Sequence, residues 1–151
     1  MTQTPEYYIE KAIYDYLVAS TGSLSPVTNA NIVMSLDITK RKLPYIIPIV
    51  TEVSPVVTPI GGIDRYGLTI EVQQNLYDTT PAKADSLFKN VRNLFYTSSF
   101  NLNTYLPTEM TVEIGGITEG IPKIERGIDQ ENGIWLHKLH LDLVIRTQET
   151  L

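Results

Sequence analysis

Cysteine is absent from this 151-residue chain, and histidine and tryptophan are scarce. Without cysteine the protein has no disulfide, no thiol nucleophile and no zinc–thiolate site. Histidine occurs twice and tryptophan once. No segment approaches the roughly 18 consecutive apolar residues that a membrane-spanning helix requires. The sequence therefore excludes thiol chemistry and argues against a membrane protein.

Positive charge is also in short supply. Lysine and arginine number 12 against 17 acidic residues, which gives a net charge of −5. A general nucleic-acid-binding protein needs a surplus of basic residues to contact phosphates, and this chain has none. The composition is otherwise that of a globular protein, and the length predicts a single domain over residues 1–151. The N-terminus lacks the basic and apolar segments of a signal peptide, so we expect an intracellular product.

Two helices are predicted from apolar residues at helical spacing. The first follows the capping residue Thr4 and ends before Gly22. The second follows the capping residue Thr80, with Pro81 at its first position, and includes residues 82–96. Its apolar residues recur at intervals of three and four, which predicts packing against a sheet. They are Ala84, Leu87, Phe88, Val91, Leu94 and Phe95.

Residues 44–59 combine the isoleucine and valine content of a strand with four prolines. Pro44 and Pro48 are four residues apart, so in a strand both lose their N–H donors on the same edge. Pro55 and Pro59 share this spacing. Because central strands exclude proline, we expect an extended edge strand or arm that pairs on one side only.

The remaining segments read as strands and turns. Residues 68–76 alternate apolar and polar side chains, which predicts a half-buried strand with one face in water. Residues 60–67, IGGIDRYG, are predicted to form a turn or hairpin loop, and short strands are predicted at 110–114 and 121–126. Together the elements predict an α+β fold: an antiparallel or mixed sheet with two helices on one face and the proline-rich segment at its edge.

The long closing strand, residues 134–147, contains both histidines and follows a turn at Asn132-Gly133. Residues three apart on a strand point to opposite faces, so His137 and His140 cannot chelate one metal ion. We expect His137 on the apolar face and His140 in the exposed polar row. A small metal-dependent enzyme that uses both histidines and nearby carboxylates is the alternative, and the strand alternation disfavours it.

No other pattern of catalytic or cofactor-binding residues is present. The glycine pairs do not match a phosphate-binding loop, and no serine or threonine lies in a nucleophile-elbow pattern. The carboxylates around the Asn-Gly turn are expected to be exposed, and carboxylates need burial to acquire separated pKa values for acid–base catalysis. We therefore predict no enzymatic activity, no cofactor and no metal.

Acidic residues gather between Glu109 and Asn132, a stretch that carries −4 of the net charge of −5. The stretch is either a solvated hairpin region or a surface turned toward something that it must repel. A short basic run at 40–42 is either a solvated turn or a contact to a partner. The six acidic residues are Glu109, Glu113, Glu119, Glu125, Asp129 and Glu131.

The order of these elements resembles that of the tail terminator proteins of long-tailed bacteriophages, a family of tail completion (neck) proteins. The resemblance rests on arrangement and covers nearly the whole chain. After the N-terminal helix come LPYII at 43–47, LTIEV at 68–72, the helix AKADSLFKNVRNLFY at 82–96 and a final strand ending in DLVIR at 142–146. The long proline-rich segment departs from the short members of the family.

This resemblance implies a structural virion protein of the tail or neck, assembled in the host cytoplasm. Proteins of this family form homohexameric rings at the head-proximal end of the tail tube. The ring stops tube polymerisation and offers a docking surface for head–tail joining. The implied partners are further copies of the chain, the tail tube protein and the head–tail connector or other neck proteins. DNA passes through the lumen without sequence-specific binding, and no membrane is involved.

Two hypotheses connect the residues to that role. The six acidic residues face the lumen, where they repel DNA. The second hypothesis assigns contacts with a neighbouring subunit or tail protein to Lys40, Arg41, Lys42, Pro44 and Pro48. Another neck component with the same plan, such as a stopper or head-completion protein, is the first alternative. A protein-binding module of a host bacterium is a further one.

Overall fold

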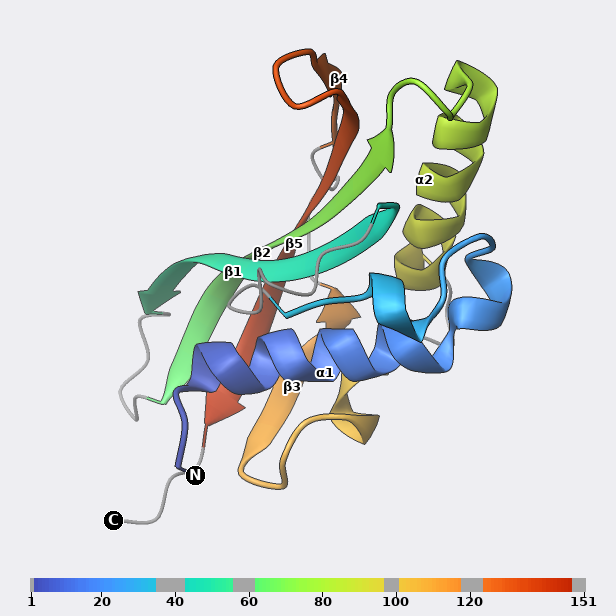
Figure 1. The fold of residues 1–151 in the computed structure, drawn as a ribbon. Helices are drawn as coiled ribbons and strands as arrows, with labels where there is room; N and C mark the ends of the chain where they lie inside the picture. Colours follow the sequence, from blue (N-terminus) through green and yellow to red (C-terminus); the bar gives the residue numbers. More distant parts are fainter. Residues whose placement is uncertain (1, 35–42, 56–61, 97–100, 118–123, 148–151) are drawn as a thin grey trace.

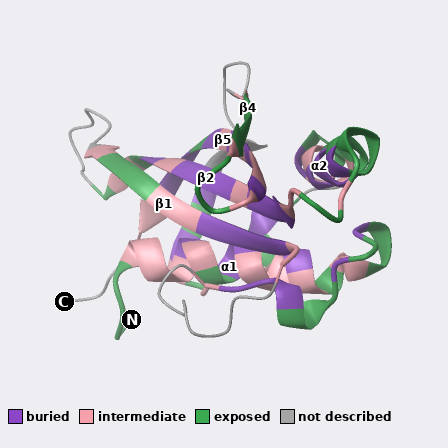
Figure 2. Cartoon of the chain, turned by 45° about the horizontal axis from the view of Figure 1, so that its top comes forward, coloured by how far each residue is buried: buried purple, intermediate pink, exposed green. Residues whose placement is uncertain are grey.

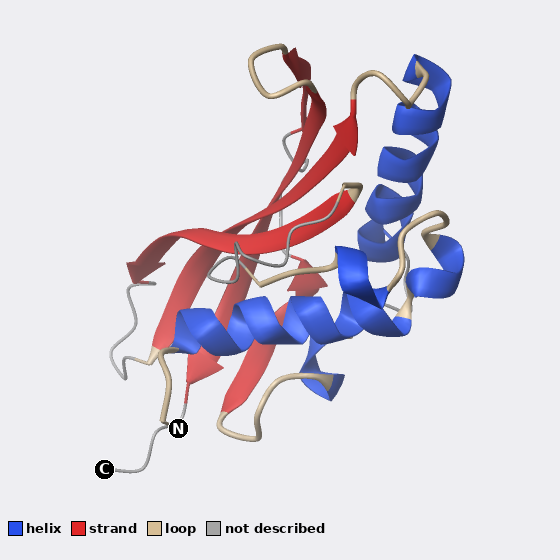
Figure 3. Cartoon of the chain, in the orientation of Figure 1, coloured by secondary structure: helices blue, strands red, loops and turns tan. Residues whose placement is uncertain are grey.

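The computed structural model describes residues 2–34, 43–55, 62–96, 101–117 and 124–147, without the side chains of residues 55 and 113–117. Within these residues the fold has five strands and two α-helices, and Figure 3 shows their arrangement. The elements are α1 (Pro5–Ala19), β1 (Tyr45–Pro55), β2 (Ile63–Asn75), α2 (Pro81–Tyr96), β3 (Met110–Ile117), β4 (Ile124–Asp129) and β5 (Ile134–Thr147). Short 3-10 helices lie at Thr21–Ser23, Asn29–Asn31 and Leu102–Thr104.

The strands form one antiparallel sheet in the order β1-β2-β5-β3, and β4 also pairs with β5. β5 is therefore the central strand, with β2 on one side and both β4 and β3 on the other. β4 pairs with the first half of β5 and β3 with its second half. The β4–β5 hairpin lies at the end of the molecule opposite the two termini (Figure 1). The predicted α+β fold is confirmed.

Both helices begin where their capping residues predict. The Oγ1 of Thr4 accepts a hydrogen bond from the backbone N–H of Tyr7 at 3.3 Å. The Oγ1 of Thr80 accepts one from the N–H of Lys83, also at 3.3 Å. Each bond satisfies one of the donors that a helix leaves unpaired in its first turn.

The helices pack on the same face of the sheet, and their apolar sides form a single core with it (Figure 2). α1 contributes Ile9, Ile13 and Leu17, all fully buried. On the sheet, alternate residues of β2 and β5 fill this core, as the period of two in a strand requires. They are Tyr66, Leu68, Ile70, Val72, Leu139, Leu141, Leu143 and Ile145.

The start of β2 corrects the sequence prediction. Residues 60–67 were expected to form a turn, but Ile63–Gly67 belong to the strand. All five residues pair with β5, and Asp64–Gly67 also pair with β1. The long β5 supplies a partner for each of these residues, and that partner is remote in the sequence. Among the described residues of the predicted loop, Gly62 has a left-handed backbone, with a φ of 76°.

The sheet face turned away from the helices is called the second face below, and it also departs from expectation. It carries Tyr45 and Ile47 of β1, Thr69 and Gln73 of β2, and the polar row of β5. A face in water was predicted here, yet Thr69 is 5% exposed and Gln73 is 9% exposed. A small second cluster of Val33, Tyr45 and Ile47 covers part of this face, and Leu43 and Ile49 pack against it.

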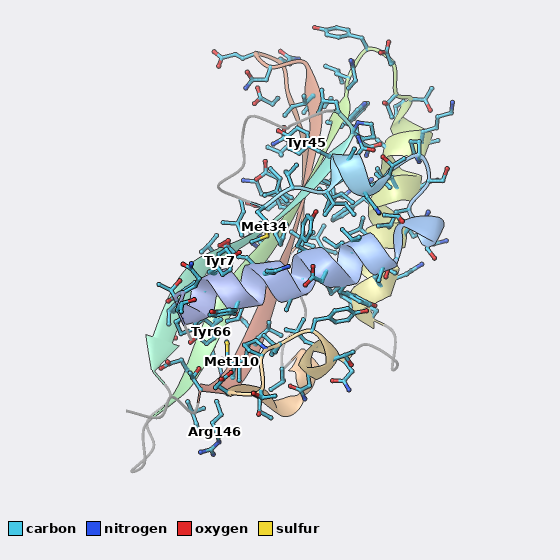
Figure 4. All side chains as sticks on the ribbon, turned by 60° about the horizontal axis from the view of Figure 1, so that its bottom comes forward. Tyr7, Met34, Tyr45, Tyr66, Met110 and Arg146 are labelled. Atoms are coloured by element: carbon cyan, nitrogen blue, oxygen red, sulfur yellow. The ribbon has the colours of Figure 1, made fainter. Side chains whose placement is uncertain are left out.

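Tyr66 and Met110 lie toward the end of the sheet near the termini (Figure 4). Tyr66 and Met110 are both buried in the core there. Burial raises the pKa of Tyr66 to about 12. In the described part of the chain, neither helix is long and apolar enough to cross a membrane.

Candidate functional site

His137 belongs to the helix-facing row of β5, where it is 4% exposed. Its ring packs on Phe88 of α2 with the centroids 4.8 Å apart. The Nδ1 atom is buried without a hydrogen-bond partner among the described residues. Burial lowers the pKa of His137, and the nearby Arg126 guanidinium lowers it further. The side chain is thus a neutral core group, as the alternation of the strand predicted.

His140 lies on the second face and links three strands. Its Nδ1 is 2.8 Å from the Oγ1 of Thr69 on β2, and its Nε2 is 2.9 Å from the Oε2 of Glu125 on β4. The hydrogen bond from His140 lowers the pKa of Glu125, and Lys138 beside it acts in the same direction. The two histidines therefore point to opposite faces of the sheet, as the strand alternation predicted.

Thr69, His140 and Glu125 connect a hydroxyl, an imidazole and a carboxylate in the order used by hydrolases. In such a site the hydroxyl is accessible and the carboxylate is buried, whereas here the hydroxyl is buried and the carboxylate is exposed. A nucleophilic hydroxyl must reach the substrate, whereas Thr69 is 5% exposed and the Glu125 side chain is 64% exposed. The row is a cross-strand hydrogen-bonded connection that holds β4 and β2 to β5.

No metal centre is apparent in the part of the chain that the structure describes. Within those residues, no group of three or more histidine, aspartate or glutamate side chains is placed to hold an ion. The alternative of a metal-dependent enzyme thus lacks a ligand set here.

The predicted acidic stretch does not form one patch. Glu109 immediately precedes β3, next to the C-terminal end of β5. Glu125, Asp129 and Glu131 lie on the β4–β5 hairpin, next to the N-terminal end of β5. These two ends are about 40 Å apart at roughly 3.3 Å per residue. The Glu113 side chain and the whole of Glu119 fall outside the described residues.

Hydrogen bonds within the hairpin turn hold the Asp129 carboxylate in position. Asp129 accepts hydrogen bonds from the backbone N–H of Asn132 at 3.2 Å and from its Nδ2 at 2.8 Å. These bonds lower the pKa of Asp129, and the bond from the Asn132 side chain has the largest effect. Gly133 adopts a φ of 63°, as the predicted Asn-Gly turn requires. Its carbonyl accepts from the N–H of Leu76, so the turn is also tied to the end of β2.

A cavity of about 410 Å³ opens on the second face beside this turn. Tyr45 donates a hydrogen bond to Gln73, and Gln73 in turn donates to Glu71, so the polar side chains along one wall are already engaged with one another. Sequence reasoning missed this cavity because its lining comes from three separate segments of the chain. The lining residues are Leu43, Tyr45, Glu71, Gln73, Asp129, Asn132, Ile134 and Leu136.

The prolines of β1 lie on its outer edge. The carbonyl of Ile46 accepts a hydrogen bond from Val33, which lies outside β2, so Ile46 directs its backbone groups away from β2. Pro48, two residues on, faces the same way. A register shift between Val50 and Glu52 then inserts one residue, so that Pro48 is opposite Ile70 and Pro55 opposite Asp64.

Ile70 and Asp64 are six apart on β2, and an even spacing keeps the same orientation. Pro48 and Pro55 therefore both remove a donor from the outer edge, although their own spacing of seven is odd. Between them, the N–H of Val50 donates to the Oε1 of Glu10 on α1 at 3.4 Å. The outer edge of β1 is thus poor in free donors, which limits the addition of a further strand.

The other residues predicted to contact a partner are only partly described. Pro44 directly precedes β1 and is half-buried, and Pro48 is buried. Lys40, Arg41 and Lys42 lie outside the described residues, as does Pro59. Searches with the sequence matched no family model and no curated protein.

Proposed function

We propose that this protein is a structural component of a phage virion that forms a ring at the head-proximal end of the tail. The ring would end tail-tube polymerisation and join the tail to the head connector. The order of the elements supports this proposal. The family resemblance rests on that order, and the described elements follow it: α1, β1, β2, α2 and β5. No catalytic step is part of this function.

The two unlike edges of the sheet support a ring. A closed ring of identical subunits needs a heterologous contact, in which one surface meets a different surface on the next subunit. β1 presents an edge poor in donors, whereas the β4 edge on the opposite side of the sheet contains no proline. Such unlike edges favour a heterologous contact over a two-fold one.

The hairpin carboxylates support a lumen through which DNA passes. Glu125 and Glu131 are exposed and Asp129 is half-exposed, and all three lie on the same projecting hairpin. Carboxylates along a channel repel the phosphate backbone and keep it from adhering. The proposed lumen-facing set is accordingly the hairpin group, because Glu109 lies at the far end of the sheet.

The experiment is a tube-length assay. The tail tube protein encoded by the same phage is polymerised in vitro, and this protein is added during elongation. The proposal expects tubes that stop growing and carry the protein at one end, with lengths that fall as its concentration rises. A stopper or head-completion protein would bind the connector and leave tube length unchanged. Tubes of unchanged length without end-bound protein would refute the proposal.

A further inference from the structure

The outer edge of β4 has free backbone groups, and the register of the sheet shows which residues supply them. Pro48 turns away from β2, so Ile70 opposite it directs its N–H and C=O toward β5. By the same alternation, Leu139 opposite Ile70 bonds back to β2, and Ile124 opposite Leu139 points outward. Arg126 and Ile128 follow Ile124 at a spacing of two and point outward as well.

Among the described residues, no partner pairs with these three outward positions. The neighbouring edge of β3 differs, because two donors at its start are taken. The N–H of Met110 donates to the carbonyl of Pro107 at 3.0 Å, and the N–H of Val112 donates to the Oδ1 of Asn103 at 2.8 Å. With the edge of β1 restricted by prolines, β4 is the described strand best prepared to accept another strand.

We propose that the outer edge of β4 binds an extended segment of another protein that carries two basic side chains flanking a large apolar one at alternate positions. The segment would add to the sheet as a further strand. This inference depends on the geometry of β4 and does not depend on the ring. It assigns the outer edge of β4 to another protein, so the contacts between ring subunits would use other surfaces of the chain.

We infer basic side chains in the bound segment from the charges of the β4 residues that it would face. Glu125 and Asp129 lie on the second face of β4, four residues apart, with Gly127 between them. Hydrogen bonds lower the pKa of both carboxyl groups, so both carry their charge at neutral pH. Lys138 is one strand further in, about 5 Å farther from an added strand than the carboxylates. The nearest charges are therefore negative, and side chains directly across a strand pair interact most strongly.

The apolar side chain follows from Gly127. A Cβ at this position would meet no atom within 4 Å, so the space above it is open. A depression of about 200 Å³ lies there, with Leu136 and Ile128 as its apolar lining. A side chain placed directly across from Gly127 would fill this space and cover Leu136.

A second copy of β4 fits this edge poorly. Two antiparallel copies can pair only in registers that keep each residue on its own face of the sheet. In the register centred on Glu125, Glu125 lies opposite Glu125 of the other copy. In the register centred on Arg126, Arg126 lies opposite Arg126 of the other copy. Centring it on Gly127 brings Glu125 opposite Asp129, and centring it on Ile128 brings Glu125 opposite Glu131. Each register thus juxtaposes like charges, which destabilises a strand pair.

The test uses a fluorescent seven-residue peptide with lysine at its second and sixth positions, phenylalanine at its fourth and valine or threonine elsewhere. A matched peptide has glutamate in place of both lysines. Anisotropy with the full-length protein gives the affinities, and hydrogen–deuterium exchange locates the site. We expect the lysine peptide to bind roughly tenfold more tightly than the glutamate peptide and to protect residues 124–129.

Two variants test the backbone and the depression separately. Arg126→Pro removes an outward N–H without touching the ladder to β5, and Arg126→Ala is its matched control because it keeps that N–H. We expect roughly tenfold weaker binding for the proline variant than for the alanine variant. Gly127→Val fills the depression and should weaken binding of the phenylalanine-containing peptide while preserving the fold.

Three results would overturn the proposal. The first is no measurable binding of the lysine peptide to the folded wild-type protein. The second is equal affinity for the lysine and glutamate peptides, or protection outside residues 124–129. The third is protection of residues 124–129 that rises with protein concentration in the absence of peptide, which would assign the edge to a second copy of the chain.

Discussion

The Nε2 atom of His140 lies 2.9 Å from the Oε2 atom of Glu125, and this contact ties β4 to the central strand on the second face of the sheet. Glu125 is on a six-residue strand that pairs with β5 alone. We expect Glu125→Gln to loosen β4 locally and to leave the rest of the sheet unaffected. Amide exchange at Gly127 should accelerate, while exchange at Ile70 stays unchanged. Equal acceleration at both amides would contradict a local role.

His137 makes the stability of the fold depend on pH in a defined window. Burial lowers its pKa in the folded state, so the unfolded chain binds a proton first as the pH falls. Stability is therefore complete above the unfolded pKa of about 6.5 and is lost as the pH falls below it. His137→Leu should flatten this loss between about pH 6.5 and 5 in urea unfolding. His140→Asn, on the opposite face, is the control and should retain it.

Tyr66 should make the stability of the fold depend on pH in the alkaline range as well. Its folded pKa of about 12 is above the ordinary value, so the fold favours the neutral phenol. Its contribution is present below about pH 10 and is lost as the pH rises toward 12, by about 2 kcal/mol. Tyr66→Phe should reduce the alkaline loss of stability, measured by thermal unfolding from pH 8 to 11. Tyr77→Phe is the control, since Tyr77 is 81% exposed; an identical effect there would count against the explanation.

Gly133 cannot carry a side chain without cost. Its φ of 63° is in the left-handed region, and a Cβ would lie 2.9 Å from the Cε2 of Tyr77. Gly133→Ala should lower the free energy of unfolding by about 1–2 kcal/mol. Adding Tyr77→Ala should restore part of that loss, because it removes the contact but not the backbone strain. Gly22→Ala meets no atom within 4 Å and should change stability by less than about 0.5 kcal/mol.

Pro48 is expected to protect the β1 edge from unwanted pairing. Pro48→Val restores an N–H donor on the outer edge of β1, so it should increase self-association. Light scattering measured against protein concentration tests this. Pro5→Ala is the matched control, because Pro5 is in the first turn of α1, where an N–H has no helical partner in any case. Unchanged scattering for Pro48→Val would mean that the proline does not guard this edge.

Local patterns in the sequence predicted those features whose interactions are formed by residues close in the sequence. The caps at Thr4 and Thr80, the Asn-Gly turn and the full extent of β5 are all confirmed. The opposite orientations of His137 and His140 are confirmed too, because the period of two belongs to the strand itself.

Features set by distant partners could not be predicted in this way. The residues 63–67 look like a loop, and only their pairing with β5 makes them a strand. Gln73 is polar, but Tyr45 from β1 covers it and bonds to it. Likewise, the register shift between Val50 and Glu52 decides that Pro48 and Pro55 share an edge, and the sequence contains no local sign of it.

The mass of the assembled protein tests the proposed ring most directly. Native mass spectrometry or mass photometry is applied to the purified full chain, alone and in the presence of its tail tube protein, over a wide range of concentrations. The ring predicts a species of six times the 17.0 kDa chain mass, alone or at tube ends. A single-chain mass under all of these conditions would contradict it.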